Sequence, residues 1–385
     1  MKKPIKVLHL STHNEDCGIG KYQEMFLDAM QIDDSVQNEF FGISPSQIKV
    51  MNKKDYEAAF SKLEERLKEF DVLHIQHEFS FYFKNELELA VKIARSLRKK
   101  VIVTIHTSAN IGNPSAQIDG YGLRSFARRI KAAIRKKNFE ANFINPLKLV
   151  DLILVHNDVT KQSLTSRGVP ENIISKIVIP VPEIDFKITT NEIKNNLNVK
   201  DGDIVYATIG FLHRFKGVEE AIKALGYLPD NYKLAIIGGL HQGTNDTRIY
   251  DKLTDLILSM KLKDRVYITG YVKDDEHMNA LIRECDACVF PYDKDYYSNV
   301  SSAALNNSFA NHMPTIAYPT QSFIELNTAE DAMVLTPTFA YYELVREMQK
   351  LDLAAAAQKA KKFAINNSYQ KISKELEGYY KATAQ

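Results

Sequence analysis

The sequence predicts two α/β domains, each built on a doubly wound parallel sheet of the Rossmann type. Short, nearly continuous apolar runs alternate with helical patterns in the first half of the chain. Strands buried on both faces of a parallel sheet have this composition. The alternation stops at Pro180 and Pro182 and begins again at Ile204. At 385 residues the chain also exceeds what one hydrophobic core usually holds, which favours two domains.

The predicted strands fall into two groups, and the predicted helices lie between them. The strands of the first group are 5–10, 72–76, 101–105, 152–155 and 177–179, with helices over 56–70 and 87–97. The strands of the second group are 204–209, 233–237, 266–269, 287–290 and 315–317.

The boundary between the domains is expected as a hinge near residues 180–190. Residues 364–384 have a helical pattern and follow the second group of strands, so this helix is expected to return to the first domain. We therefore predict an N-terminal domain of residues 1–183 together with 364–385, and a C-terminal domain of residues 184–363. In such folds ligands bind at the carboxyl ends of the strands, so the two domains are expected to face a cleft.

Composition excludes several classes of protein. The net charge is +2, from 50 basic and 48 acidic residues, which gives no overall nucleic-acid footprint. The three cysteines, Cys17, Cys285 and Cys288, are too few for a disulfide framework and favour a reducing, cytoplasmic compartment. Cys285 and Cys288 precede a strand rather than opening a helix, so we interpret them as packing residues. No run approaches the roughly eighteen apolar residues of a membrane span.

Three motifs of the N-terminal domain follow predicted strands. Gly18 and Gly20 in "STHNEDCGIGKY" come after the first strand, and they fit either a tight turn or a close approach to a phosphate or sugar. His77 and Glu78 in "HIQHEFSFY" follow the second strand and are candidate ligand contacts, whereas His74 within that strand is expected in the core. His106 closes "VIVTIH" and could donate a hydrogen bond to a sugar hydroxyl or act in proton handling.

One motif of the C-terminal domain carries two cations. In "ATIGFLHRFKGVEEAIKAL" a strand ends at Gly210, and Arg214 and Lys216 precede the helix that begins after Gly217. Cations beside a helix N-terminus form a plausible clamp for a diphosphate. A solvated basic turn is the alternative interpretation.

The segment from Tyr296 to Ile324 has no Lys, Arg, Asp or Glu, although 25% of the chain is charged. Composition alone would place about seven charged residues there. A helix start whose backbone amides bind an anion explains this neutrality, because carboxylates would repel the anion. A buried helix with an ordinary Ser or Asn cap also explains it.

Residues 123–139 form a basic amphipathic pattern, with Phe126, Ile130 and Ile134 among seven Arg and Lys residues. Such a helix can rest on an anionic membrane or hold an acidic acceptor. A charged face exposed to solvent is the commoner explanation.

In their order along the chain, these motifs resemble those of the retaining, nucleotide-sugar-dependent glycosyltransferases of the GT-B fold, the glycosyl transferase group 1 or family 4 proteins. The resemblance runs from "CGIGKY" through "VTIHTS", "GFLHRFKGVEEAIKAL" and "CDACVFPY" to "SSAALNNSFANHMPTIAYP". The closing "NNSYQKISKELEGYY" is similar to the terminal crossover helix of that family. Nearly the whole chain is covered.

The resemblance implies roles for individual residues. Gly18 and Gly20 would lie in the glycine-rich loop over the diphosphate, and His106 would contact the donor sugar. Lys216 matches the phosphate-binding lysine, with Arg214 supplying charge from a shifted position, since the family's arginine position is Phe211 here.

The same resemblance places the donor at the uncharged segment from Tyr296 to Ile324. Two family glutamates correspond to Asn299 and Asn307, and the amides of Val300, Ser301 and Ser302 would meet the diphosphate. His77 and Glu78 would bind the acceptor.

The implied function is transfer of a sugar from a nucleoside diphosphate sugar to a saccharide, lipid-linked or protein acceptor, with retention of configuration and without a metal. The implied location is cytoplasmic, with peripheral membrane contact through 123–139 as one interpretation. The substitutions at 211, 299 and 307 leave a second hypothesis, a catalytically silent protein that stabilises a partner transferase. A nucleotide-sugar epimerase ranks third, because its acid/base chemistry needs carboxylates that the neutral segment lacks.

Overall fold

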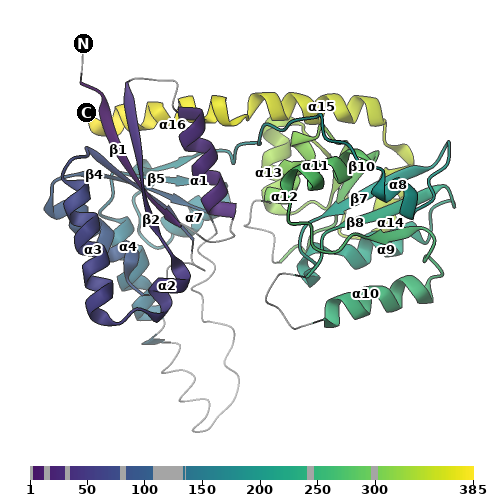
Figure 1. Cartoon of the computed structure of the whole chain (residues 1–385), viewed down its shortest axis with the longest axis horizontal. Coiled ribbons are helices and arrows are strands. Elements are labelled where there is room, and N and C mark those ends of the chain that lie inside the picture. The colour runs from purple at the N-terminus through teal and green to yellow at the C-terminus, as the bar shows by residue number, and fades with distance from the viewer. Residues whose placement is uncertain are drawn as a thin grey trace, which may run out of the picture. The chain divides into compact units, whose positions relative to one another are not determined.

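The computed structural model describes residues 3–12, 18–30, 35–78, 84–106, 133–134, 136–240, 247–295 and 302–385. The chain divides into two compact units. Unit 1 contains Met1–Val178 and Tyr369–Gln385, and unit 2 contains Ile179–Ser368. Each is an α/β unit around one parallel sheet (Figure 1).

Unit 1 contains a six-stranded sheet in the order β2-β1-β3-β4-β5-β6, with every pair parallel. Its strands are β1 (Ile5–Thr12), β2 (Val36–Ile43), β3 (Val72–His77), β4 (Lys100–Ile105), β5 (Leu152–Val155) and β6 (Ile174–Lys176). Its α-helices are α1 (Gly18–Ala29), α2 (Pro45–Val50), α3 (Lys53–Leu67), α4 (Glu86–Ser96), α6 (Asn145–Leu147), α7 (Asp158–Thr165) and α16 (Tyr369–Ala384). A π-helical turn, η2 (Glu140–Ile144), precedes α6, and a 3₁₀ turn, η3 (Glu171–Ile173), precedes β6.

Helix α3 illustrates how local sequence forms these elements. Asn52 caps it by accepting a hydrogen bond from Asp55 N at 3.0 Å. Its buried residues recur at helical spacing and face the core of unit 1, namely Tyr56, Phe60, Leu63 and Leu67. A capped helix with one apolar face is stable mainly through this packing.

The two faces of the first sheet differ in chemistry. Leu8, Leu73 and Val103 face an apolar core that α3 and α4 cover. His9 and His74 alternate with these residues on the strands and are fully buried on the other face. Figure 1 shows α1 and α16 covering that second face. Helix α16 thus belongs to unit 1, although it comes from the far end of the chain.

Unit 2 contains a second six-stranded parallel sheet, in the order β12-β11-β10-β7-β8-β9. Its strands are β7 (Ile204–Ile209), β8 (Tyr232–Ile237), β9 (Val266–Ile268), β10 (Ala287–Phe290), β11 (Thr315–Ala317) and β12 (Val334–Leu335). Its α-helices are α8 (Glu192–Asn196), α9 (Val218–Leu225), α10 (Arg248–Ser259), α11 (Asp275–Arg283), α12 (Ala303–Ala310), α13 (Gln321–Glu330), α14 (Tyr341–Lys350) and α15 (Leu353–Asn366). A 3₁₀ turn, η4 (Arg214–Lys216), precedes α9.

The structure confirms the predicted pair of Rossmann-like sheets and corrects three details. Strand β6 lies at 174–176 rather than 177–179, because Ile174 and Ser175 pair with β5. Strands β2 and β12 were not predicted. Helix α15 ends at Asn366, so the predicted helix over 364–384 is two helices. The break occurs where Asn367 O accepts a hydrogen bond from Val181 N at 2.8 Å.

Candidate functional site

In unit 2, the carboxyl end of β7 leads directly to Lys216. Gly210 follows β7 with φ +115°, a conformation that favours glycine. A Cβ at Gly210 would lie 3.7 Å from the Cβ of Ala304 and 3.8 Å from Nζ of Lys216. The end of β7, the Lys216 ammonium and the first turn of α12 are therefore neighbours.

Tyr292 connects Lys216 to the cap of α12. Lys216 Nζ donates a hydrogen bond to the Tyr292 hydroxyl oxygen at 2.6 Å. That hydroxyl lies 3.0 Å from Ser302 Oγ, which caps α12 by accepting from Leu305 N at 3.3 Å. Burial raises the pKa of Tyr292, so its phenol stays neutral and can donate to Ser302. Tyr292 thus links Lys216 to Ser302 at a helix N-terminus, where the amides and the helix dipole favour an anion.

The remaining predicted residues of unit 2 are placed differently. The Arg214 guanidinium is exposed and lies 4.5 Å from the centroid of the Phe215 ring. Phe211 is exposed and stacks on Tyr271 with ring centroids 5.7 Å apart. Asn307 lies half-buried within α12. Asn299, Val300 and Ser301 lie outside the described residues.

In unit 1, His106 follows β4 and is held on both sides of its ring. Its Nε2 lies 2.9 Å from Gln76 Oε1, and its Nδ1 lies 3.2 Å from His156 Nε2. Tyr22 of α1 packs edge-on against the His106 ring, with centroids 4.7 Å apart. Burial, together with the nearby His156, holds the pKa of His106 well below its ordinary value. His106 is therefore a neutral, hydrogen-bonded imidazole at neutral pH.

The other predicted residues of unit 1 lie around the same end of the sheet. Backbone N–H of His106 donates to His77 O at 3.1 Å. The His77 side chain is buried against Phe143, with ring centroids 4.8 Å apart, and burial lowers its pKa to about 3. Glu78 is also buried. Gly18 and Gly20 occupy the first turn of α1, the helix that carries Tyr22 to His106.

Sequence reasoning missed Tyr292, Gln76 and His156. His156 follows the strand "LILV" directly, just as His106 follows "VIVTI", so the rule that selected His106 would also have selected His156. Tyr292 follows β10 in the same way, after Pro291. Gln76 has no such signal, because it lies within β3.

Two histidines of unit 1 with lowered pKa values predict acid sensitivity. Burial lowers the pKa of His9 and of His156 to about 4, from 6.5. The unfolded chain therefore binds protons first as the pH falls. With respect to these histidines, the free energy of unfolding of unit 1 should be largest above about pH 6.5. It should decrease toward pH 4 by roughly 1.4 kcal/mol per pH unit for each such histidine.

Hydrogen exchange measured by mass spectrometry would check this expectation peptide by peptide. After correction for intrinsic rates, peptides from β1 and β3 should lose protection between pH 7 and pH 5. Peptides from β7 and β8 serve as the internal control, because none of the described histidines of unit 2 is buried: His213 is exposed, and His277 and His312 are half-buried. Equal loss of protection in both sheets would contradict the prediction.

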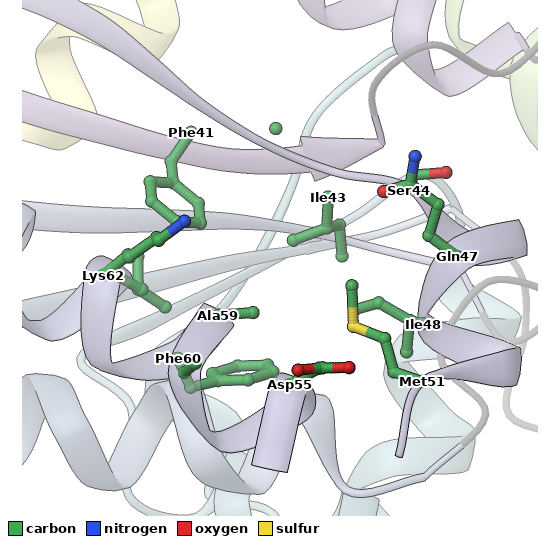
Figure 2. Close-up of a pocket in the computed structure, with 13 residues that line it drawn as sticks. Phe41, Ile43, Ser44, Gln47, Ile48, Met51, Asp55, Ala59, Phe60 and Lys62 are labelled. Carbon is green, nitrogen blue, oxygen red and sulfur yellow. The ribbon is translucent and has the colours of Figure 1, made fainter. Parts of the chain in front are cut away.

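A separate cavity of about 390 Å³ lies in unit 1 among β2, α2 and α3. Figure 2 shows Ile43, Ile48 and Met51 lining it, with the exposed Asp55 and Lys62 also on its wall. None of the sequence-predicted site residues lines this cavity. It offers mainly apolar contacts and is distinct from the groups around His106 and Lys216.

Among the described residues, no group of three or more His, Cys, Asp or Glu is placed to hold a metal ion. No helix within the described ranges is long and apolar enough to cross a membrane. The basic segment 123–139 lies mostly outside the described residues. Cys285 and Cys288 are buried and not disulfide-bonded, as expected of packing residues.

Solved structures similar to this chain define its fold as GT-B, two Rossmann-like α/β domains. Anabaena HepE, solved in complex with UDP, matches with a TM-score of 0.70 and 14% identity over 98% of this chain and 100% of HepE. A glycosyltransferase from Rickettsia africae matches with a TM-score of 0.70 and 12% identity over 100% of both chains. Sucrose-phosphate synthase from Thermosynechococcus elongatus gives 0.64 and 14% over 98% of both.

The match to a family model lies within unit 2. Residues 189–368, just under half of the chain, match the family model of glycosyl transferases group 1. The matched segment contains Lys216, Tyr292 and Ser302, the three residues that meet at α12. No curated protein matches the chain by sequence.

Proposed function

We propose that the protein is a retaining glycosyltransferase that moves a sugar, of the hexosyl type, from a nucleoside diphosphate sugar to an acceptor. The observation that carries the proposal is the meeting of Lys216, Tyr292 and Ser302 at the N-terminus of α12. The family match over 189–368 and the neighbours solved with UDP support it. HepE is also described in complex with UDP-glucose.

In this proposal unit 2 binds the donor. Negative charge grows on the diphosphate as it leaves, so the Lys216 ammonium and the amides of α12 stabilise the transition state more than the ground state. Arg214 adds charge from the exposed turn before α9. Ser302 orients the phosphate by a hydrogen bond. These groups neutralise the diphosphate, so we propose that no metal is required.

Unit 1 is proposed to bind the acceptor and to meet the donor sugar through His106, with Gly18 and Gly20 at the start of α1 approaching the diphosphate. His77 and Glu78 are proposed to shape the acceptor site from within the sheet. The proposed acceptor is a saccharide, a lipid-linked glycan or a protein, in glycan or cell-envelope biosynthesis. The proposed location is the cytoplasm. Contact of residues 123–139 with anionic lipid would place the enzyme at the inner face of the membrane.

A thermal-shift panel tests the donor assignment. UDP, GDP, ADP and dTDP and their glucose conjugates would be added to the purified protein with EDTA present. A ligand at 100 times its dissociation constant stabilises the folded state by about 2.7 kcal/mol, so at least one should raise the melting temperature by several degrees. No shift with any of them would reject the proposal.

Turnover separates the enzyme from the silent-partner alternative. The stabilising donor should be hydrolysed or transferred, and NMR of the product should show the donor's anomeric configuration. Stabilisation without turnover, even with acceptors supplied, would favour the partner role. An inverted anomer would refute retention.

A further inference from the structure

A continuous chain of hydrogen bonds crosses the polar face of the first sheet. His156 Nδ1 lies 3.0 Å from the carbonyl oxygen of Ile177, and His156 Nε2 lies 3.2 Å from His106 Nδ1. His106 Nε2 then meets the Gln76 amide at 2.9 Å. The path starts at a backbone carbonyl, which can only accept, so His156 Nδ1 carries the proton of the first bond.

Beyond Gln76 the chain reaches helix α16. The Gln76 amide makes a longer contact of 3.4 Å with His74 Nε2. His74 Nε2 is also 2.8 Å from Thr104 Oγ1, and His74 Nδ1 is 2.7 Å from the Tyr380 hydroxyl. His74, Gln76 and Thr104 are at most 1% exposed. Buried polar groups of this kind strongly favour arrangements in which each donor meets an acceptor.

Counting protons on the His106–His156 pair leaves two arrangements. If the oxygen of Gln76 faces His106, both ends of the pair meet acceptors. Three protons must then sit on two rings, and one of these half-buried rings is a cation. If the Gln76 amide is turned by half a turn, its NH₂ donates to His106 Nε2, and each ring carries a single proton. The oxygen and nitrogen of an amide exchange places by such a turn.

Burial selects the second arrangement. Among the described residues, no carboxylate is a hydrogen-bonding partner of either ring, and a charge that is withdrawn from water without compensation is costly. Burial also lowers the pKa of His156 to about 4 and that of His106 well below its usual range. Both rings are therefore neutral near pH 7. His156 carries its proton on Nδ1, toward Ile177, and leaves Nε2 as an acceptor for His106.

We propose that His156 is a positioning residue that holds His106 in the tautomer protonated on Nδ1, so that Nε2 of His106 presents a lone pair. The inferred proton positions depend only on unit 1 and not on the proposed function. The proposal deepens the proposed function and rests on it in one respect: His106 Nε2, which carries the lone pair, is the atom that contacts the donor sugar. A sugar hydroxyl that donates to Nε2 takes the place of the Gln76 N–H as the donor to this lone pair.

Nitrogen NMR of protein labelled with ¹⁵N-histidine tests the proton positions, because protonated and unprotonated ring nitrogens resonate far apart. In the parent at pH 7, His106 and His156 should both show protonated Nδ1 and unprotonated Nε2. A His106 protonated on Nε2, or on both nitrogens, would overturn the proposal. The experiment needs no donor, so it is independent of the thermal-shift panel.

Two variants at His156 separate positioning from packing. His156→Phe keeps an aromatic ring but removes the acceptor for His106 Nδ1–H, so His106 should change to the Nε2-protonated tautomer. His156→Gln supplies one acceptor oxygen and one donor amide and should restore the parental tautomer in most molecules. An unchanged His106 spectrum in His156→Phe would refute the positioning role.

The control is His213→Gln, which changes an exposed histidine of unit 2 and should leave the His106 signals unaltered. Should His156→Phe fail to fold, neutron diffraction from crystals of the deuterated parent reads the same protons. Deuterium on His106 Nδ1 and on the Gln76 nitrogen facing Nε2 would support the proposal. Deuterium on His106 Nε2 would contradict it.

Discussion

Replacing Lys216 by methionine is expected to weaken binding of the stabilising nucleoside diphosphate about 10- to 150-fold. Hydrogen bonds to a charged group contribute about 1.5–3 kcal/mol, and each 1.4 kcal/mol is roughly a factor of ten in affinity. Lys216 is the cation that the structure places beside the cap of α12, through Tyr292. Methionine keeps the length of the side chain and most of its packing. Isothermal titration with the diphosphate that gives the largest thermal shift measures the change.

Lys223→Met is the matched control for this variant. Lys223 lies on α9, in the same unit, and forms a 2.7 Å ion pair with Glu220 on the same helix. Lys223→Met removes the same charge from the same unit as Lys216→Met, so any general effect of net charge appears in both variants. We expect less than a twofold change in affinity for Lys223→Met. Equal weakening by both variants, or none in Lys216→Met, would refute the anion site at α12.

Tyr292→Phe tests the connection between Lys216 and Ser302. The phenol is buried and donates to Ser302 while accepting from Lys216. Its removal frees the ammonium from one partner but leaves its charge in place. We therefore expect a smaller loss than in Lys216→Met, of about 2- to 10-fold, corresponding to about 0.5–1.5 kcal/mol for one neutral hydrogen bond. A larger loss than that of Lys216→Met would mean that Tyr292 itself contacts the ligand.

The central strands of both sheets were predictable because they are buried on both faces. Such strands are continuous apolar runs, as in "VIVTI" and "IVYATI", and helices between them leave few alternatives to parallel pairing. Edge strands lack this signal. Strand β2 reads "VQNEFFGI" and is only partly buried, so its polar residues conceal it. Strand β12 has two residues.

Candidate site residues could be predicted where a polar or charged residue follows a strand or begins a helix. Lys216, Ser302 and His106 were selected as candidates because each lies shortly after a strand or at a helix start. Tyr292 and His156 were missed although they lie in equivalent positions, because tyrosine and a lone histidine are common in cores. Their roles appear only through partners distant in sequence, such as Lys216 for Tyr292 and His106 for His156. Single-sequence patterns do not contain these pairings.

Gly217 is expected to be the most sensitive glycine near the site. It has φ +65° and lies between η4 and α9. A Cβ there would fall 1.7 Å from the carbonyl oxygen of Pro291, which is backbone and cannot rotate away. The close approach of Gly217 to Pro291 is what brings Lys216 beside Tyr292, the residue after Pro291. Stability and the geometry of the anion site therefore depend on the same contact.

Gly217→Ala should lower the free energy of unfolding of unit 2 by about 2–5 kcal/mol. The left-handed backbone costs an alanine about 1–2 kcal/mol, and overpacking adds about 1–3 kcal/mol. Gly202→Ala isolates the first term, because Gly202 has φ +88° but nothing within 4 Å of its added Cβ. Hydrogen exchange of β7 and β8 peptides should show a large loss of protection in Gly217→Ala and a small one in Gly202→Ala. Similar losses in the two variants would mean that the Pro291 contact relaxes freely, and Lys216 would then not depend on it for its place beside Tyr292.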